Sequence, residues 1–357
     1  MNNIKDRGAN TEEYWKLRTH RLETMQEKTV SELLSDMKSL YKKAMSDIDK
    51  DVEAFYGRYA TENGVSMQEA RRILDPDKLR SAKEELRRYY EFADPKKINP
   101  KMAKAYRARL HELESKMRIS RLEEIKARLE HIMIRLADAE EKAFFQTMGK
   151  IYADSHSLAS YSLDSTLGFS AGYIAPSNEV LNKVVHEKWL GRNFSESIWT
   201  SKGKLLESIQ TDLLSGIALG YNPRKIASSM HKSTGTSYRN CEVLARTESL
   251  HFANAATETA YKEHGVEKYQ FVCGLDERTC PRCGKLDGQV FELKYKQEGV
   301  DYPVIHPQCR CSTVPFWDDD ISKLFEDAQR VARDDGGKLY EVPADMTYEQ
   351  WKNQVKN

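Results

Sequence analysis

The stretch 276–311 reads DERTCPRCGKLDGQVFELKYKQEGVDYPVIHPQCRC and holds four of the six cysteines in this 357-residue chain. They form two pairs, Cys280-x-x-Cys283 and Cys309-x-Cys311. A Cys-x-x-Cys turn lets two thiolates converge on one ion, and a second group of donors further along the chain supplies the other corner of a tetrahedron. Mixed thiolate and imidazole ligation in this geometry suits zinc best. We therefore predict a bound Zn²⁺.

An imidazole joins these thiols, because His306 lies three residues before Cys309. Five donors then compete for four positions, and we expect Cys280, Cys283, His306 and one of the last two cysteines to bind. Cys309 and Cys311 are two residues apart, so on an extended strand both face the same way and spacing does not choose between them. Enough donors exist to fill every position, which favours a closed structural site over a catalytic one. Disulfides and free structural thiols are the alternatives to a metal.

The composition is that of long solvated helices, with 31% charged and 39% apolar residues. The net charge of +1 excludes binding of a polyanion through bulk electrostatics. No run of 18 apolar residues would form a membrane span, and the start MNNIKDRGANTEEYW has no apolar core of a leader peptide. We expect a soluble protein made in a reducing cytoplasm, with no membrane partner and with free thiols.

The first half of the chain has the three-and-four spacing of amphipathic helices. The first apolar face comprises Val30, Leu33, Met37, Leu40, Ala44, Ile48, Val52 and Phe55. We expect Gly57 and the Asn63-Gly64 pair to end that helix. One long helix is predicted over 101–152, with an apolar seam at Leu122, Ile125, Leu129, Ile132, Leu136, Ala139 and Ala143. A coiled coil and an ordinary helix bundle explain this seam equally well.

Between these helices lies a basic segment. Ser66 and Glu69 predict a capping box for a short helix, and a further helix is expected over 77–92. Residues 71–128 carry 18 Lys and Arg against 10 Asp and Glu, an excess of 8. Such runs are commonly solvated helix faces; the alternative is salt-sensitive contact with DNA phosphates. The candidates for DNA contact are Arg71, Arg72, Arg87, Arg88, Lys96 and Lys97.

The second half begins with a Ser-, Tyr- and Gly-rich stretch that predicts an irregular linker at 155–176. Helices follow, one beginning at Asn222-Pro223 and a longer one over 237–263. Strands are then predicted at 269–273 and 290–293, and an extended segment at 340–343. The fold class is mainly α, with long N-terminal helices and a small zinc-stapled α+β domain. The expected domains are 1–154 (helical), 155–176 (linker), 177–317 (zinc-stapled) and 318–357 (tail).

Charged residues stand close to the cysteines in sequence. Asp276 or Glu248 could act as a general base beside a metal-bound water. However, no His-Glu-x-x-His motif and no deaminase signature accompanies them. We therefore expect no catalytic residue, and we expect Arg246, Glu248, Asp276 and Arg278 to form a buried ion-pair and hydrogen-bond network.

The second half also resembles a known family, the Mu F-like minor head (head morphogenesis) proteins of tailed phages. The resemblance rests on WLGRNFSESIW (189–199), LLSGIALGYNPRKIA (213–227), LARTESLHFANAA (244–256), LDERTCPRCGKLDGQVF (275–291) and HPQCRC (306–311). RYATENGVSMQEARRIL (58–74) and KLYEVPADMTYEQW (338–351) are similar to versions from phages of Gram-positive bacteria.

This resemblance implies a structural component of the procapsid and virion, present in few copies inside the head near the portal protein. Its expected partners are the portal and the capsid or scaffold components, with optional non-specific DNA contact during packaging or ejection. The alternatives are a zinc-dependent nucleic-acid hydrolase and a free-standing DNA-binding protein.

Overall fold

The computed structural model describes residues 4–62, 121–167, 178–189, 191–219, 221–317, 329–334, 336, 338–343 and 345–355. Its longer helices are α1 (Ile4–Glu62), α5 (Arg121–Leu167), α6 (Asn178–His186), α7 (Phe194–Ala218) and α8 (Pro223–Glu263). The C-terminal part holds β1 (Lys268–Val272), α9 (Pro281–Leu286), β2 (Val290–Glu292), η1 (Leu293–Tyr295), β3 (Ser312–Phe316), β4 (Gln329–Arg333), β5 (Leu339–Pro343) and α10 (Tyr348–Val355). None of the described helices is long and apolar enough to cross a bilayer.

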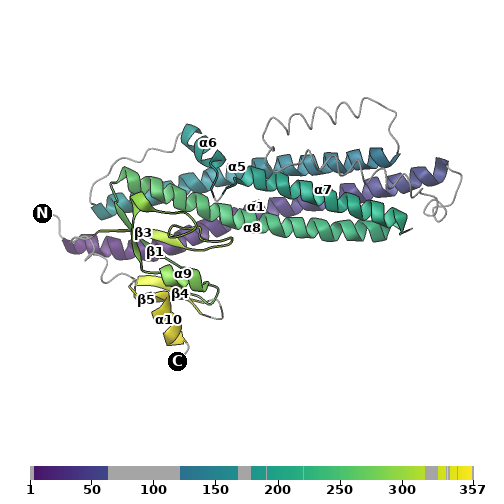
Figure 1. Ribbon diagram of the computed structural model, residues 1–357. Helices are drawn as coiled ribbons and strands as arrows, with labels where there is room; N and C mark the ends of the chain where they lie inside the picture. Colours follow the sequence, from purple (N-terminus) through teal and green to yellow (C-terminus); the bar gives the residue numbers. More distant parts are fainter. Residues whose placement is uncertain are drawn as a thin grey trace. The chain divides into compact units, whose positions relative to one another are not determined.

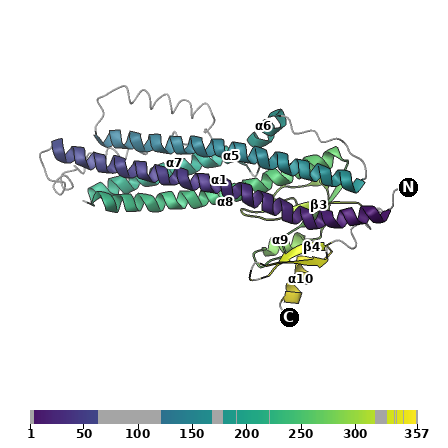
Figure 2. The ribbon, with the colours of Figure 1, turned by 180° about the vertical axis from the view of Figure 1, so that it is seen from behind.

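The chain divides into two compact units. Unit 1 comprises 1–32, 145–191 and 243–357, and unit 2 comprises 33–144 and 192–242. Within unit 2, the parts of α1, α5, α7 and α8 run side by side (Figures 1 and 2). The domain boundaries predicted from the sequence stay a prediction.

The apolar stripe of α1 is confirmed. Of its eight predicted positions, all are buried except Leu40, which is half-buried. Gly57 does not end the helix, since α1 continues to Glu62. The correction has a local reason: Phe55 and Tyr56, just before the glycine, are buried, and the Thr61 hydroxyl donates to the carbonyl of Gly57. Packing of neighbouring side chains outweighs the roughly 1 kcal/mol penalty of a helical glycine.

The long helix α5 is described from Arg121 and runs past its predicted end to Leu167. Residues 155–167 are thus helical, and the prediction of an irregular segment there was wrong. Three hydroxyl groups of this segment bond back to carbonyls one turn earlier: Ser162 to Leu158 at 2.7 Å, Ser165 to Tyr161 at 2.8 Å and Thr166 to Ser162 at 2.9 Å. Polar side chains satisfied in this way do not interrupt a helix.

The buried face of α5 departs from the predicted heptad seam. Ile132, Ala139 and Ala143 are half-buried, whereas Met133 and Ala137 are buried. A drift of this kind is expected when a straight helix of 3.6 residues per turn packs in a bundle. A coiled coil is therefore not shown.

The helices predicted from Asn222-Pro223 and over 237–263 are one helix, α8. Asn222 caps it, because its Oδ1 accepts the backbone N–H of Lys225 at 2.8 Å. In unit 2, α8 and α7 approach closely. A Cβ atom on Gly216 would lie 2.4 Å from a side-chain carbon of Ile226, so glycine is required there.

In the described part of unit 1, the strands form two small antiparallel sheets. The first has the order β2-β1-β3, with Tyr269 opposite Phe291 on one side and Pro315 on the other. The second pairs β4 with β5. The strands predicted at 269–273 and 290–293 and the extended 340–343 are confirmed within a residue or two. The predicted fold class, mainly helical with a small C-terminal sheet part, is confirmed as well.

A core cluster in unit 1 joins the first sheet to helices. Tyr261 near the end of α8, Tyr269 on β1 and Tyr302 are all enclosed, and Leu163 of α5 packs with them. Figure 1 shows β1 and β3 alongside α8. The capping box at Ser66, the helix over 77–92 and the six DNA-contact candidates lie outside the described residues.

Candidate metal centre

The first half of the centre is the turn that leads into α9. Cys280 is the N-cap of this helix, and Pro281 occupies its first position, where a missing N–H costs nothing. The backbone N–H of Cys283 points at the Cys280 sulfur at 3.4 Å. The cap therefore places both sulfur atoms on the same side of one helical turn.

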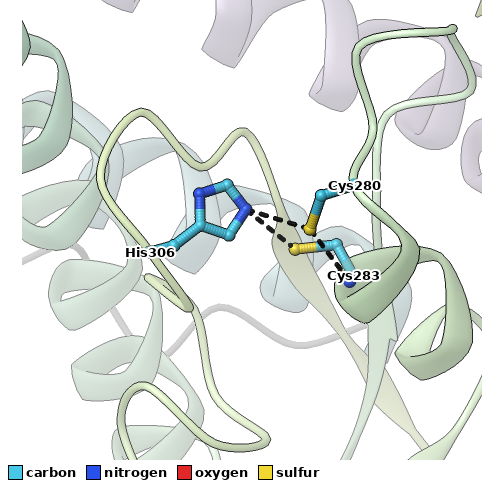
Figure 3. A group of neighbouring side chains, drawn as sticks. All are labelled: Cys280, Cys283 and His306. Atoms are coloured by element: carbon cyan, nitrogen blue, oxygen red, sulfur yellow. Dashed lines mark hydrogen bonds between the residues drawn. The ribbon is translucent and has the colours of Figure 1, made fainter.

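His306 completes a first group of donors. Its Nε2 lies 3.3 Å from the sulfur of Cys280 and 3.3 Å from that of Cys283. Figure 3 shows the imidazole ring presenting this nitrogen to both sulfur atoms. The other ring nitrogen, Nδ1, lies 2.9 Å from the carbonyl of Pro307. A carbonyl only accepts, so Nδ1 carries the proton, and in the neutral ring the lone pair of Nε2 then faces the sulfurs. This is the tautomer that a metal-ligating histidine needs.

A second group shares Cys283 with the first. The sulfur atoms of Cys283, Cys309 and Cys311 lie within 4.8 Å of one another, and all three residues are buried. The Cys283 and Cys309 sulfurs are 4.0 Å apart. Cys283 is thus the point at which all five predicted donors meet.

Neighbouring groups set the protonation of these thiols. Hydrogen bonds from Cys283 and Cys311 hold the pKa of Cys309 well below its usual range. Burial opposes ionisation of Cys280, but the N–H groups of Cys283 and Arg282 outweigh it and lower the pKa of this thiol. The thiolate is the form that binds a metal. Soft sulfur donors with one imidazole fit Zn²⁺, and the residues present could hold one such ion.

Asp276 is buried and ion-paired, with a partner that the sequence did not single out, whereas the side chain of Arg278 contacts it from an exposed position. The Asp276 carboxylate accepts paired hydrogen bonds from Arg310, one of them at 2.6 Å, and the backbone N–H of Arg278 at 2.9 Å. Burial works against ionisation of Asp276, but the hydrogen bonds and charge of Arg310 outweigh it and keep the pKa of this carboxyl below its ordinary value. One feature of the sequence could have pointed to Arg310 as a residue of the site, namely its position between two predicted ligands, Cys309 and Cys311.

Glu248 does not join this ion pair among the contacts that the structure gives. Its carboxylate accepts the indole N–H of Trp189 at 3.0 Å, and that indole stacks on the ring of His251 with centroids 4.3 Å apart. Burial raises the pKa of Glu248 to about 7, and burial lowers the pKa of His251 to about 3. The side chain of Arg246 is exposed. Among the four predicted residues, the contacts that the structure gives join only Asp276 and Arg278, and not all four in one network.

Comparison with known proteins finds one family whose model matches part of this chain. The model for phage Mu protein F-like proteins matches residues 207–314. An uncharacterized protein of Haemophilus influenzae is 25% identical over 167 residues, covering 46% of this chain and 37% of that protein. An Enterococcus faecalis protein named NAD(+)--arginine ADP-ribosyltransferase EFV is 20% identical over 181 residues, covering 47% of this chain and 37% of that protein.

The chain therefore matches well under half the length of either relative. No solved structure matches it significantly. The predicted resemblance is confirmed for the C-terminal half, which contains a phage Mu protein F-like domain. The Gram-positive phage type stays a prediction.

Proposed function

We propose, from the phage Mu protein F-like domain in the C-terminal half of this chain, that the protein is a structural component of a phage head. In this proposal it is built into the procapsid and virion, associates with the portal protein and assists head morphogenesis. Contact with DNA during packaging or ejection is a further part of the proposal.

The observation that carries the proposal is the family match over 207–314, which includes every predicted metal donor. The geometry supports a structural rather than a catalytic use of these donors. Asp276, one of the two predicted bases, lies four residues before Cys280 and is engaged by Arg310. Glu248, the other predicted base, is enclosed and bonded to Trp189.

For the metal, we propose Cys280, Cys283, His306 and Cys309 as the ligands of one structural Zn²⁺. With Zn–S bonds of about 2.3 Å, a tetrahedral site separates two sulfurs by about 3.8 Å. The 4.0 Å between Cys283 and Cys309 is close to this value. Cys311 then remains a buried neighbouring thiol. The ion would supply a cross-link between the turn before α9 and the loop before β3, and these residues would hold it.

The test is co-expression of the full chain with the portal protein of the same phage, followed by affinity capture and sedimentation with procapsids. We expect the chain to co-purify with the portal and to sediment with procapsids. A chain that binds neither would contradict the proposal. Cross-linking mass spectrometry of the captured complex would then identify the contact surface.

Two other functions make different predictions. A zinc-dependent hydrolase would turn over DNA or RNA and would lose this activity in folded Asp276→Ala or Glu248→Ala. A free-standing DNA-binding protein would show affinity that falls steeply with salt and maps to 71–128. Turnover sensitive to those substitutions would replace our proposal with an enzyme.

A further inference from the structure

We propose that residues 329–355, which lie beyond the family match, position the metal-binding turn, and that Arg330 is the residue through which they do so. This inference rests on the proposed zinc centre. It adds that the contacts of Arg330 help to determine how tightly the centre holds its ion. The argument begins at Asp287, the residue directly after α9.

The Asp287 carboxylate joins three separate segments to the end of the turn. It accepts the backbone N–H of Cys273, just after β1, at 2.8 Å, and that of Tyr348, at the start of α10, at 2.7 Å. Two guanidinium nitrogens of Arg330 on β4 donate to it at 2.9 and 3.1 Å. The Asp287 N–H in turn donates to the carbonyl of Cys283. A shift of Asp287 would therefore move the backbone of a ligand.

Arg330 is the cation that makes this arrangement possible. Its side chain is 8% exposed and that of Asp287 is 0% exposed, so the carboxylate is neutralised by an ion pair removed from water. The guanidinium also donates to the carbonyls of Cys273 and Met346. Only the planar fork of arginine reaches these acceptors together, because lysine offers a single nitrogen.

The same C-terminal segment holds the other side of the turn. The Tyr348 hydroxyl donates to the carbonyl of Thr279, the residue before Cys280, at 3.1 Å. Its ring lies against α9 so closely that a Cβ on Gly284 would fall 2.3 Å from it. The segment thus contacts the turn at Thr279, at Gly284 and at Asp287.

Apolar packing links the segment to the sulfurs themselves. Trp351, Ala332 and Val342 belong to the same buried cluster as Cys283 and Cys309. A metal ligand whose backbone and surroundings are fixed loses less freedom on binding, and removal of such support typically weakens metal binding about 10- to 100-fold.

The experiment measures zinc transfer from the full-length protein to a chromogenic chelator at neutral pH, for wild type, Arg330→Lys and Arg330→Met. The exposed Lys338→Met in the same segment is the control. We expect release about 10- to 100-fold faster from Arg330→Met, an intermediate rate from Arg330→Lys, and an unchanged rate from the control. Circular dichroism verifies that each variant is folded, and Asp287→Asn replaces Arg330→Met if the latter does not fold.

Amide hydrogen exchange supplies a second readout. A general loss of stability would speed exchange throughout the protein, whereas a local loss of support speeds it only near the metal-binding turn. We expect faster exchange in peptides that cover 280–288 and unchanged exchange in unit 2. Release at the wild-type rate from folded Arg330 variants would overturn this inference alone. Wild-type protein without zinc would overturn the zinc centre and this inference with it, so the zinc content of the wild type distinguishes the two failures.

Discussion

The guanidinium of Arg310 forms paired hydrogen bonds with the carboxylate of Asp276, 34 residues away in the sequence. Arg310 lies between two predicted ligands, and Asp276 lies just before the Cys-x-x-Cys turn. The ion pair therefore connects the two halves of the candidate metal centre through residues that are not themselves predicted ligands.

Breaking this pair should destabilise unit 1. In Asp276→Asn the charge of Arg310 loses its partner, and we expect the free energy of unfolding to fall by about 2 kcal/mol. This loss is smaller than for a fully buried pair because the side chain of Arg310 is 31% exposed. Urea denaturation is the measurement. Glu277→Gln, an exposed neighbour, should have almost no effect; equal effects of the two substitutions would mean that the pair does not contribute.

The two cysteines at the end of the motif should differ in zinc content. Cys309→Ser removes a proposed ligand, so the purified protein should contain far less zinc than wild type. Cys311→Ser removes only a neighbouring thiol and should retain close to one zinc per chain. Elemental analysis of the two variants decides between them, and the reverse order of zinc contents would assign the fourth position to Cys311.

Glu248 should make stability depend on pH in a specific direction. Its pKa is raised in the folded state from 4.5 to about 7. The folded protein then holds this proton more tightly than the unfolded chain, so the stabilisation is present below pH 4.5 and is lost as pH rises to about 7. Glu248→Gln is neutral at every pH and still accepts a hydrogen bond from Trp189.

We therefore expect Glu248→Gln to gain stability over wild type as the pH rises, reaching about 3 kcal/mol above pH 7. Urea denaturation at several pH values, with Glu277→Gln as the control, measures this gain. A difference that does not vary with pH would show that the carboxyl has its ordinary pKa.

A buried ion pair in unit 2 provides a test that does not involve the metal. Lys202 lies 2.7 Å from Glu140, with side chains 3% and 1% exposed, and also donates to the Tyr41 hydroxyl. Lys202→Met leaves a buried carboxylate unpaired and should cost about 3–5 kcal/mol. The double variant Lys202→Met, Glu140→Leu should recover most of this loss.

Lys204→Met, at an exposed position two residues away, is the matched control for this helix. Thermal and urea unfolding followed by circular dichroism give the comparison. A double variant as unstable as Lys202→Met would show that the loss does not arise from the unpaired carboxylate.

Local patterns predicted much of the fold. The spacing of apolar residues identified the buried face of α1. The spacing of the four cysteines and His306 identified five donors, within 32 positions, that the structure places close together. These signals are short-range consequences of helix and turn geometry. The length of α5 was missed because serine-rich sequence is ambiguous: the back-bonding of Ser162 and Thr166 becomes visible only once the helix exists.

The supporting charges could not be paired from the sequence. Arg310 and Arg330 find their partners across 34 and 43 residues, through sheet pairing that no local pattern specifies. Arg246 was expected in the network because it lies, with Glu248, close to the cysteine-rich stretch in sequence. On α8 its side chain is exposed while that of Glu248 is buried, so sequence proximity did not indicate contact.

The most direct test of the central claim, that Cys280, Cys283, His306 and Cys309 hold one structural zinc, is native mass spectrometry of the full chain purified without chelator. We predict a single species with one Zn²⁺ per chain, which Cys280→Ser abolishes together with the folded C-terminal part, because structural zinc contributes on the order of 10 kcal/mol to folding. Wild-type protein that carries no metal, and whose melting a chelator leaves unchanged, would contradict the account.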